Sequence, residues 1–311
     1  MKIKNVISSE QFLDRELLEQ LFVSAKHLEE LDATGSIPHK LSGKILATVF
    51  YEPSTRTRFS FESAMMKLGG EIITTESAAQ FSSAIKGESI EDSIRIIAGY
   101  SDAIVLRHPQ TGAAKVAARV SNVPVINAGD GSGEHPTQAL LDLYTIYKEK
   151  GSLDNLHIAL VGDLLYGRTI HSLLKFFPLY KDVRVYLVAP DKLKLPQLYV
   201  DYLKDHGVKH SAASDLDSIL PKLDVLYMTR VQKERFPSAE EYEEVKNAFV
   251  INEKTLTKMK SDAMIMHPLP RVTEISPKVD KDPRAAYFRQ AKNGLYTRMA
   301  LLDMIFNGSG K

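Results

Sequence analysis

Short apolar runs rich in β-branched residues alternate with stretches of helical periodicity along the chain, and this alternation restricts the fold more than any other feature. The apolar runs have the length of strands and cover residues 45–50, 71–75, 102–107, 123–128, 157–163, 184–190, 224–230 and 262–268. The helical stretches cover residues 58–68, 88–100, 112–120, 136–149, 168–177, 196–206 and 241–248. Such alternation is typical of parallel sheets buried under helices. The sequence therefore predicts an α/β protein with two doubly wound parallel-sheet domains, helices on both faces, linked by helices.

The domain boundary is predicted near the middle of the chain. An amphipathic helix over 10–31 opens the chain, and the helix at 136–149 ends in Lys150-Gly151, a common helix stop. We therefore expect a first domain over 1–150 and a second over 151–283. A last helix lies in 284–311; its packing partner stays open, with a return to the first domain as one option.

Composition excludes several classes of function. The formal net charge of +1 provides no basic field for nucleic acid or an acidic membrane. The absence of cysteine excludes disulfides, thiolate nucleophiles and cysteine-bound metals. Histidines do not cluster with carboxylates at ligand spacing, so no metal site is expected. No apolar run approaches the ~18 residues of a membrane span, and charges interrupt the N-terminal stretch, so we expect a cytoplasmic protein.

Polar loops follow most of the predicted strands. They read YEPSTRTR (51–58), RHPQTG (107–112), NAGDGSGEHPTQ (127–138), GDLLYGRT (162–169), MTRVQKERF (228–236) and HPLPRVTE (267–274). In open parallel sheets, ligands bind beyond the carboxyl ends of the strands. These loops are rich in Arg, Ser, Thr and Lys and poor in carboxylates. They predict anionic substrates, with phosphate in the first half, and they contain no Ser-His-Asp or paired-carboxylate machinery.

The loop 51–58 has both a structural and a chemical interpretation. Ser54 is a typical N-cap, and the backbone N–H groups after it lack intrahelical partners and attract anions. Further donors suited to phosphate follow directly: Thr55, Arg56 and Thr57. The alternative is a capped helix with surface arginines. Arg58 stands four residues before Glu62 and is expected to form a structural ion pair.

Other loops of the first half supply a second cation and a histidine. Arg107 ends a strand and is either an anion ligand or an edge arginine paired with a carboxylate. His135 precedes Pro136 at a helix start, where the cationic imidazole is disfavoured and a neutral donor to a carbonyl is favoured. A plain N-cap is the alternative for His135. Gln138 shares its face of the helix. Residues 81–89 are interpreted as a solvated loop.

In the second half, Arg230 and Gln232 leave one strand two residues apart, and the proline-stiffened residues 267–270 present carbonyls suited to an amine. GDLLYGRT nearly matches a phosphate-binding P-loop, but Arg168 replaces the lysine of that motif. Nucleotide binding is therefore an alternative that this loop alone supports.

Together, YEPSTRTR, RHPQ, GDGS with HPTQ, GDL with YGRT, MTRVQKER and HPLPR resemble the catalytic chains of the aspartate carbamoyltransferase family, within the aspartate/ornithine carbamoyltransferase superfamily. The resemblance covers nearly the whole chain in the family's order. It implies transfer of a carbamoyl group from carbamoyl phosphate to the α-amine of L-aspartate, an early step of pyrimidine synthesis, without covalent intermediate or cofactor. The alternative is a carbamoyltransferase with another amine acceptor, such as ornithine, although a cationic amine calls for carboxylates in the second-domain loops. A non-catalytic partner subunit is another alternative.

The resemblance also implies roles for individual residues. The phosphate would be held by Ser54, Thr55, Arg56, Thr57 and Arg107. The carbamoyl group would be polarised and held by Thr57, Arg107, His135 and Gln138. A neighbouring chain of a homotrimer would supply Ser82, with Ser83 as its competitor, and Lys86, which would also reach aspartate. The remaining aspartate ligands would be Arg168, Arg230, Gln232 and the carbonyl region of Leu269. Whether a regulatory chain binds stays open.

Glu52 carries a separate hypothesis. It precedes the phosphate loop, whereas Arg168 and Arg235 belong to the second domain. A pair between Glu52 and these arginines would favour a closed two-domain state. Glu52→Ala is then predicted to weaken the response to aspartate more than the binding of carbamoyl phosphate.

Overall fold

The computed structural model describes residues 3–78, 87–236 and 238–308, which form two compact units. The first unit contains Met1–Tyr144 together with Lys292–Lys311, and the second contains Thr145–Ala291. Helices α6 (Pro136–Lys150) and α11 (Tyr287–Asn307) run through the two boundaries along the chain, so helices link the units. The last helix thus contributes most of its length to the first unit.

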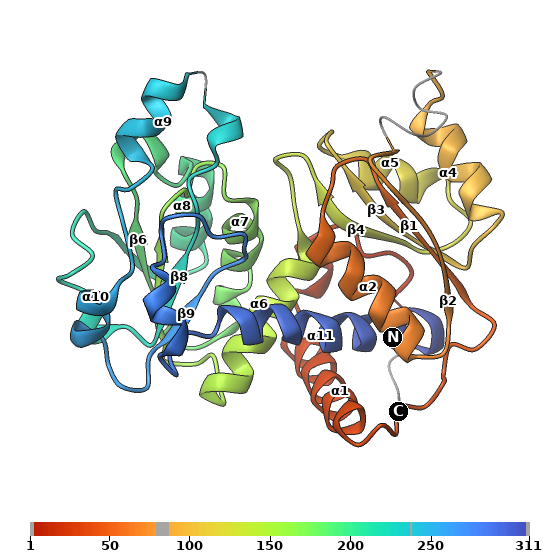
Figure 1. The fold of residues 1–311 in the computed structure, drawn as a ribbon, viewed down its shortest axis with the longest axis horizontal. Coiled ribbons are helices and arrows are strands. Elements are labelled where there is room, and N and C mark those ends of the chain that lie inside the picture. Colours follow the sequence, from red (N-terminus) through yellow and green to blue (C-terminus); the bar gives the residue numbers. More distant parts are fainter. Residues whose placement is uncertain (1–2, 79–86, 237, 309–311) are drawn as a thin grey trace. The chain divides into compact units, whose positions relative to one another are not determined.

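The first unit is built on a four-stranded parallel sheet in the order β2-β1-β3-β4. Its strands are β1 (Ile45–Phe50), β2 (Glu71–Glu76), β3 (Ala103–His108) and β4 (Val125–Asp130). Helices α4 (Ile90–Ala98) and α5 (Ala113–Val120) pack on one face, where Ala47, Val49, Ile104 and Leu106 enter the core with Ile94 and Ala117. Helices α1 (Arg15–Ala33), α2 (Thr55–Lys67) and α11 lie on the other side of this sheet in Figure 1.

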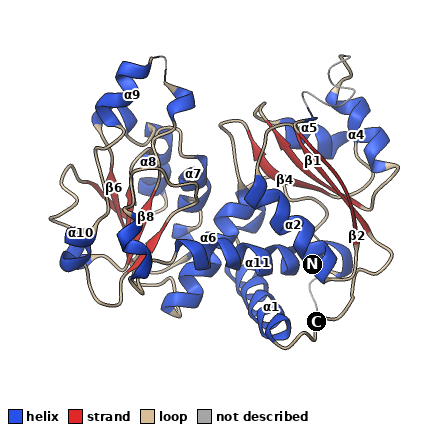
Figure 2. Cartoon of the chain, viewed as in Figure 1, coloured by secondary structure: helices blue, strands red, loops and turns tan. Residues whose placement is uncertain are grey.

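The second unit contains a five-stranded parallel sheet in the order β7-β6-β5-β8-β9. Its strands are β5 (His157–Val161), β6 (Arg184–Val188), β7 (Lys209–Ala212), β8 (Val225–Met228) and β9 (Met264–Met266). Its remaining helices are α7 (Arg168–Leu174), α8 (Gln197–Asp205), α9 (Ala239–Val245) and α10 (Glu253–Lys258). Figure 2 shows the strands of each unit enclosed by helices. The predicted α/β fold with two doubly wound parallel sheets is confirmed.

Several element boundaries differ from the prediction. The opening helix begins at Arg15, because Ser9–Phe12 form a separate 3-10 turn capped by Ser8. Helix α2 begins three residues earlier than predicted, at Thr55, and the last helix begins at Tyr287 rather than 284. Strand β7 and helix α10 were not predicted at all.

Candidate active site

Each sheet reverses its winding at one strand pair, and the predicted ligand loops leave the sheets there. In the first unit, the chain passes from β1 outward to β2 and then returns to β3 on the other side of β1. In the second, it passes from β5 to β6 and β7 and returns to β8 beside β5. Ligands of doubly wound folds bind at such switch points, beyond the carboxyl ends of the strands. The loops after β1 and β3, and those after β5 and β8, therefore mark two candidate binding regions, one in each unit.

The start of α2 follows β1 directly. The prediction that Ser54 is the N-cap is confirmed, although its side chain makes no capping hydrogen bond. Its backbone N–H donates instead to Glu76 Oε1 at 3.1 Å. Thr55 and Arg56 are exposed, and Thr57 is buried. The first turn thus presents hydroxyl, guanidinium and backbone donors at the positive end of a helix, an arrangement suited to an anion.

Arg58, in the same motif, has a different environment. Its Nη2 lies 3.2 Å from Glu76 Oε2, and its Nη1 lies 3.2 Å from Thr74 Oγ1 and 3.6 Å from Glu62 Oε1. These partners hold Arg58 against β2 and its own helix. The prediction that Arg58 is a structural ion-pair residue is confirmed.

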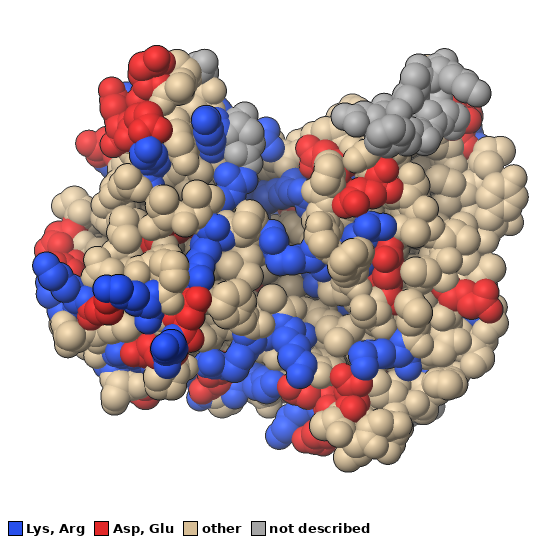
Figure 3. Space-filling model, in the orientation of Figure 1, with Lys and Arg blue, Asp and Glu red and all other residues tan. Residues whose placement is uncertain are grey.

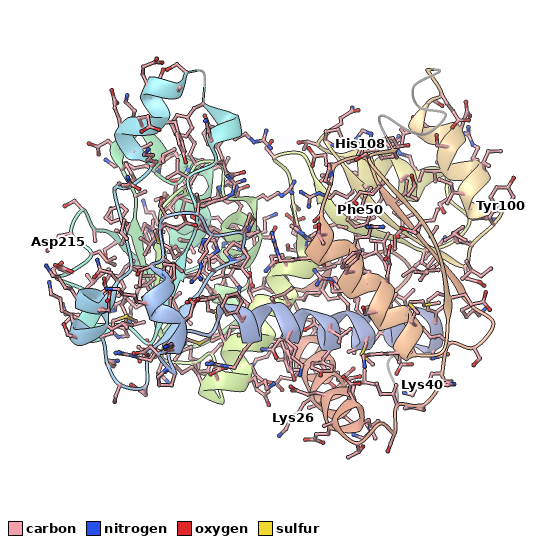
Figure 4. All side chains as sticks on the ribbon, in the orientation of Figure 1. Lys26, Lys40, Phe50, Tyr100, His108 and Asp215 are labelled. Atoms are coloured by element: carbon pink, nitrogen blue, oxygen red, sulfur yellow. The ribbon has the colours of Figure 1, made fainter. Side chains whose placement is uncertain are left out.

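Arg107 is the penultimate residue of β3, and only 15% of its side chain is exposed. Its Nη1 donates to the Ala128 carbonyl at 3.3 Å, and its Nε lies 3.6 Å from Glu52 Oε2 without a hydrogen bond to the described residues. Burial lowers the pKa of Arg107; Glu52 opposes this, and the nearby Arg56 lowers the pKa further. Two guanidinium groups therefore lie close together at the switch point of the first sheet. Figure 4 labels Phe50 and His108, the last residues of β1 and β3, where these loops emerge. The hypothesis that Glu52 pairs with second-domain arginines stays a prediction.

The loop after β4 carries His135, which is buried and directly precedes α6. Asp130 organises this loop: its Oδ1 accepts the Glu134 N–H at 2.9 Å, and its Oδ2 accepts the Gly112 N–H at 2.8 Å. Asp130 thus connects the loops that follow β3 and β4. One helical turn into α6, Gln138 donates from Nε2 to Asp142 Oδ1 at 2.9 Å. These bonds fix the segment that presents His135 and Gln138.

In the second unit, the buried Asp163 ties the loops after β5 and β8 together. Its Oδ1 accepts the Tyr166 N–H at 2.9 Å, its Oδ2 accepts the Gln232 N–H at 3.3 Å, and its own N–H donates to Thr229 Oγ1 at 3.1 Å. Burial raises the pKa of Asp163, against the effect of its backbone donors and Arg230. Sequence reasoning missed Asp163, although its position at the strand exit in GDLLYGRT was the available signal.

The predicted acid-binding residues of this unit extend from the loops that Asp163 connects. Arg168 is the first residue of α7, and Arg230 lies near enough to Asp163 to lower its pKa. Gln232 donates from Nε2 to the Tyr166 carbonyl at 2.9 Å. All three side chains are partly exposed. Two arginines and an amide at one switch point suit a ligand with carboxylate groups.

The glycines of GDLLYGRT have a structural explanation. A Cβ on Gly162, whose φ is +109°, would lie 2.3 Å from the Thr229 carbonyl oxygen, and one on Gly167 would lie 2.5 Å from the Asp163 carbonyl oxygen. Close approach of the protein's own backbone therefore requires both residues. The resemblance to a P-loop needs no nucleotide to account for it.

Leu269 follows β9 and is held in the left-handed region, with φ of 56°. Its N–H donates to His267 Nδ1 at 2.8 Å, so His267 carries its proton on Nε2, which donates to Glu274 Oε1 at 2.7 Å. Glu274 Oε2 accepts the N–H groups of Val272 and Thr273 at 3.1 and 3.0 Å. This buried network fixes the segment whose carbonyls are predicted to face an amine, and neither His267 nor Glu274 was singled out from the sequence.

Three residues predicted for the site, and two predicted absences, remain to be placed. Ser82, Ser83 and Lys86 lie outside the described residues. Within the described part of the chain, no three His, Asp or Glu side chains gather as a metal ion would require. No helix there has the length and apolar character to span a membrane. Figure 3 shows both acidic and basic side chains on the visible face of each unit.

Comparisons with known proteins agree with this geometry. The carbamoyl-phosphate-binding domain of aspartate/ornithine carbamoyltransferases matches residues 4–148, and the Asp/Orn-binding domain of the same enzymes matches 154–305. The chloroplastic aspartate carbamoyltransferase of Arabidopsis thaliana is 52% identical over 308 residues, which cover 99% of this chain and 79% of that protein.

Solved structures give the same result. The catalytic subunit of M. jannaschii aspartate transcarbamoylase is 49% identical with a TM-score of 0.91, and the match covers 98% of both chains. Aspartate transcarbamoylase from Trypanosoma cruzi, solved with carbamoyl phosphate and aspartate, is 42% identical with a TM-score of 0.91, covering 97% of this chain and 96% of that one. The resemblance predicted from the loops is therefore confirmed, and the chain belongs to the aspartate/ornithine carbamoyltransferase family.

Proposed function

We propose that this chain transfers the carbamoyl group of carbamoyl phosphate to the α-amine of L-aspartate, giving N-carbamoyl-L-aspartate and phosphate. The observation that carries the proposal is the clustering of arginines at the switch points of both sheets: Arg56 and Arg107 in the first unit, Arg168 and Arg230 in the second. Two anionic substrates call for two such clusters. The names of the relatives and the ligands of the T. cruzi structure support the same reaction.

The first unit binds carbamoyl phosphate in this proposal. Donors at the start of α2 hold the phosphate together with Arg107. Thr57, Arg107 and His135 donate to the carbamoyl oxygen, and Gln138 holds the carbamoyl amide. Arg107 suits this task because it is largely buried yet has an Nε without a hydrogen bond to the described residues. A desolvated donor strengthens its interaction with charge that develops on a nearby oxygen.

The second unit binds L-aspartate through Arg168, Arg230 and Gln232, while the carbonyl region of Leu269 faces the amine. The amine lone pair attacks the carbamoyl carbon, negative charge develops on the carbonyl oxygen, and the bond from carbon to the phosphate oxygen then breaks. The departing phosphate takes the amine proton. Because phosphate is already a good leaving group, positioning and stabilisation of the developing charge are sufficient without a covalent nucleophile.

The choice of aspartate over ornithine depends on charge. Ornithine would bring a second ammonium group, which calls for a carboxylate near the amine side of the site. The polar groups that extend from the switch point of the second sheet are instead two guanidiniums and an amide. The carboxylate of the buried Asp163 already accepts the backbone N–H groups of Tyr166 and Gln232. An acceptor with two carboxylates fits this set.

The proposal includes assembly. We infer a homotrimer in which Ser82 and Lys86 of a neighbouring chain complete each site. The relative from M. jannaschii is named a catalytic subunit, which raises the question of a regulatory chain here; copurification from the source cells would answer it. The cytoplasmic location stays a prediction, which cell fractionation tests, since the Arabidopsis relative is named chloroplastic.

An assay for ureido product tests the reaction. Purified protein receives carbamoyl phosphate with L-aspartate, and separately with L-ornithine. Product with aspartate alone is expected. Product with ornithine alone would retain the phosphate site and overturn the acceptor, and product with neither would overturn the proposed function.

A further inference from the structure

A buried arginine of the last helix lies behind the proposed carbamoyl phosphate site. Arg298, in α11, is 3% exposed, and its guanidinium carbon lies 4.9 Å from the centre of the Phe61 ring. Its Nη1 donates to Ser60 Oγ at 2.7 Å. A buried cation is costly unless hydrogen bonds and a counter-charge compensate for its lost hydration. Its partners therefore indicate what the arginine is for.

The first partner leads to the start of α2. Ser60 Oγ accepts a hydrogen bond from Arg298, and its own O–H donates to the Thr57 carbonyl oxygen at 3.0 Å. The hydroxyl is thereby oriented, since it has one proton to donate. This chain of two hydrogen bonds ends on the backbone of Thr57, which presents one of the proposed carbamoyl phosphate donors.

The second partner leads to α6. Burial lowers the pKa of Arg298 to about 10, and the nearby carboxylate of Asp142 opposes this shift. Asp142 is itself fully buried, and its Oδ1 accepts from Gln138 Nε2 at 2.9 Å. Asp142 thus orients the amide proposed to hold the carbamoyl group, and its charge acts on Arg298.

A glycine makes room for the guanidinium. A Cβ on Gly294, one turn earlier in α11, would lie 2.7 Å from Arg298 Nη1 and 3.0 Å from Leu141 Cδ2. Glycine inside a helix is less favourable than alanine. Its presence here is explained by the space that the guanidinium occupies.

We propose that Arg298 is a positioning residue for the carbamoyl phosphate site: through Ser60 it fixes the first turn of α2 at Thr57. Arg298 acts through these residues and not on the substrate. The inference rests on the proposed function, because it takes the role of Thr57 from it. Nothing in the sequence indicated this role, because Arg298 lies outside all of the polar loops that follow the strands.

The test compares Arg298→Met with Leu302→Ala, a control that removes packing from a fully buried position in the same helix but removes no polar group. In Arg298→Met, kcat/KM for carbamoyl phosphate is expected to fall at least about tenfold, while KM for aspartate stays close to wild type. Leu302→Ala is expected to lower thermal stability and leave both substrate constants unchanged. Equal effects of the two variants on carbamoyl phosphate, or wild-type constants in Arg298→Met, would overturn the proposal.

A second measurement separates this proposal from the proposed function. Calorimetric binding of inorganic phosphate needs no turnover, and Arg298→Met should weaken it while Leu302→Ala does not. If the wild-type chain forms no ureido product, the proposed function fails, and equal phosphate binding in Arg298→Met and wild type then rejects the role of Arg298 as well. Ser60→Ala serves if Arg298→Met does not fold: it breaks the link to Thr57 and should weaken phosphate binding in the same direction, and unchanged binding would count against the link.

Discussion

At the scale of single residues, the loop 51–58 contains both donors that stabilise the fold and donors suited to a ligand. Arg58 has acceptors on Thr74, Glu62 and Glu76 within 3.6 Å and contributes to packing. Ser54 begins the helix without capping it through its side chain. The two residues belong to one motif, yet one holds the fold and the other is suited to a ligand.

Ser54→Ala tests this distinction. Replacing a capping serine normally costs about 1 kcal/mol of stability. Because the Ser54 side chain makes no capping bond, the variant is expected to keep the wild-type unfolding free energy and to raise KM for carbamoyl phosphate. Urea unfolding and initial rates measure the two effects. A drop in stability with unchanged KM would assign Ser54 a structural role.

Residue roles could be predicted only where the sequence keeps partners close or a family motif marks them. The ion pair of Arg58 with Glu62 follows from helical spacing. Asp163 reaches Gln232, and Arg298 reaches Ser60, across long stretches of sequence. Contacts of this kind depend on how strands and helices pack, and a single sequence contains no local pattern for them.

At the scale of elements, hydrophobic patterning predicted the buried strands but missed an exposed edge strand and a short helix. Strand β7 reads Lys-His-Ser-Ala and is mostly exposed at the sheet edge, so it has no apolar run to detect. Helix α10 has six residues, too few to establish helical periodicity. Its start is instead marked by Asn252, whose side chain accepts from the N–H groups of Lys254 and Thr255.

The buried network around Leu269 predicts a pH dependence of stability. Burial lowers the pKa of His267 below its ordinary value of 6.5, so the folded chain keeps this histidine neutral. The unfolded chain then binds the additional proton, and stability falls as the pH drops below about 6.5, by up to about 1.4 kcal/mol per pH unit for this histidine. The lowered pKa of Glu274 acts in the same direction, but only below its ordinary value of 4.5.

Urea unfolding between pH 5 and 7.5 measures this effect in wild type and His267→Gln. Other histidines with lowered pKa values, His108, His157 and His171, contribute to the wild-type slope. His267→Gln should therefore show a shallower loss of stability with acidification, not a flat one. Identical slopes for the two proteins would exclude His267 as a source of the dependence.

At the scale of the whole molecule, both sheets use the same device. Each winds outward from a central strand and returns beside it, and each places arginines at the point of return. The order of the strands was not read from the sequence, because strand neighbours in a sheet depend on long-range pairing. The class of fold and the positions of the ligand loops could be predicted from the sequence. Strands, helices and the polar loops that follow strands each have a local pattern.

The proposed sharing of sites between chains predicts complementation. Lys86→Ala and Arg107→Ala should each be nearly inactive as homotrimers. After dissociation and reassembly of an equal mixture, about a quarter of the sites would combine an intact Arg107 with an intact Lys86 from a neighbour, so activity should reappear at that level. Chains that exchange, as shown by mass spectrometry of tagged variants, but regain no activity would contradict shared sites.

The most direct test of the account is the rate of N-carbamoyl-L-aspartate formation by Arg107→Ala, measured beside wild type and Arg119→Ala. Arg119 is an exposed arginine of α5 in the same unit and should be replaceable without loss. The account predicts that Arg107→Ala keeps its fold by circular dichroism and loses at least about a hundredfold in turnover, as removal of a donor to a developing oxyanion does. Turnover of Arg107→Ala at the wild-type rate would contradict it.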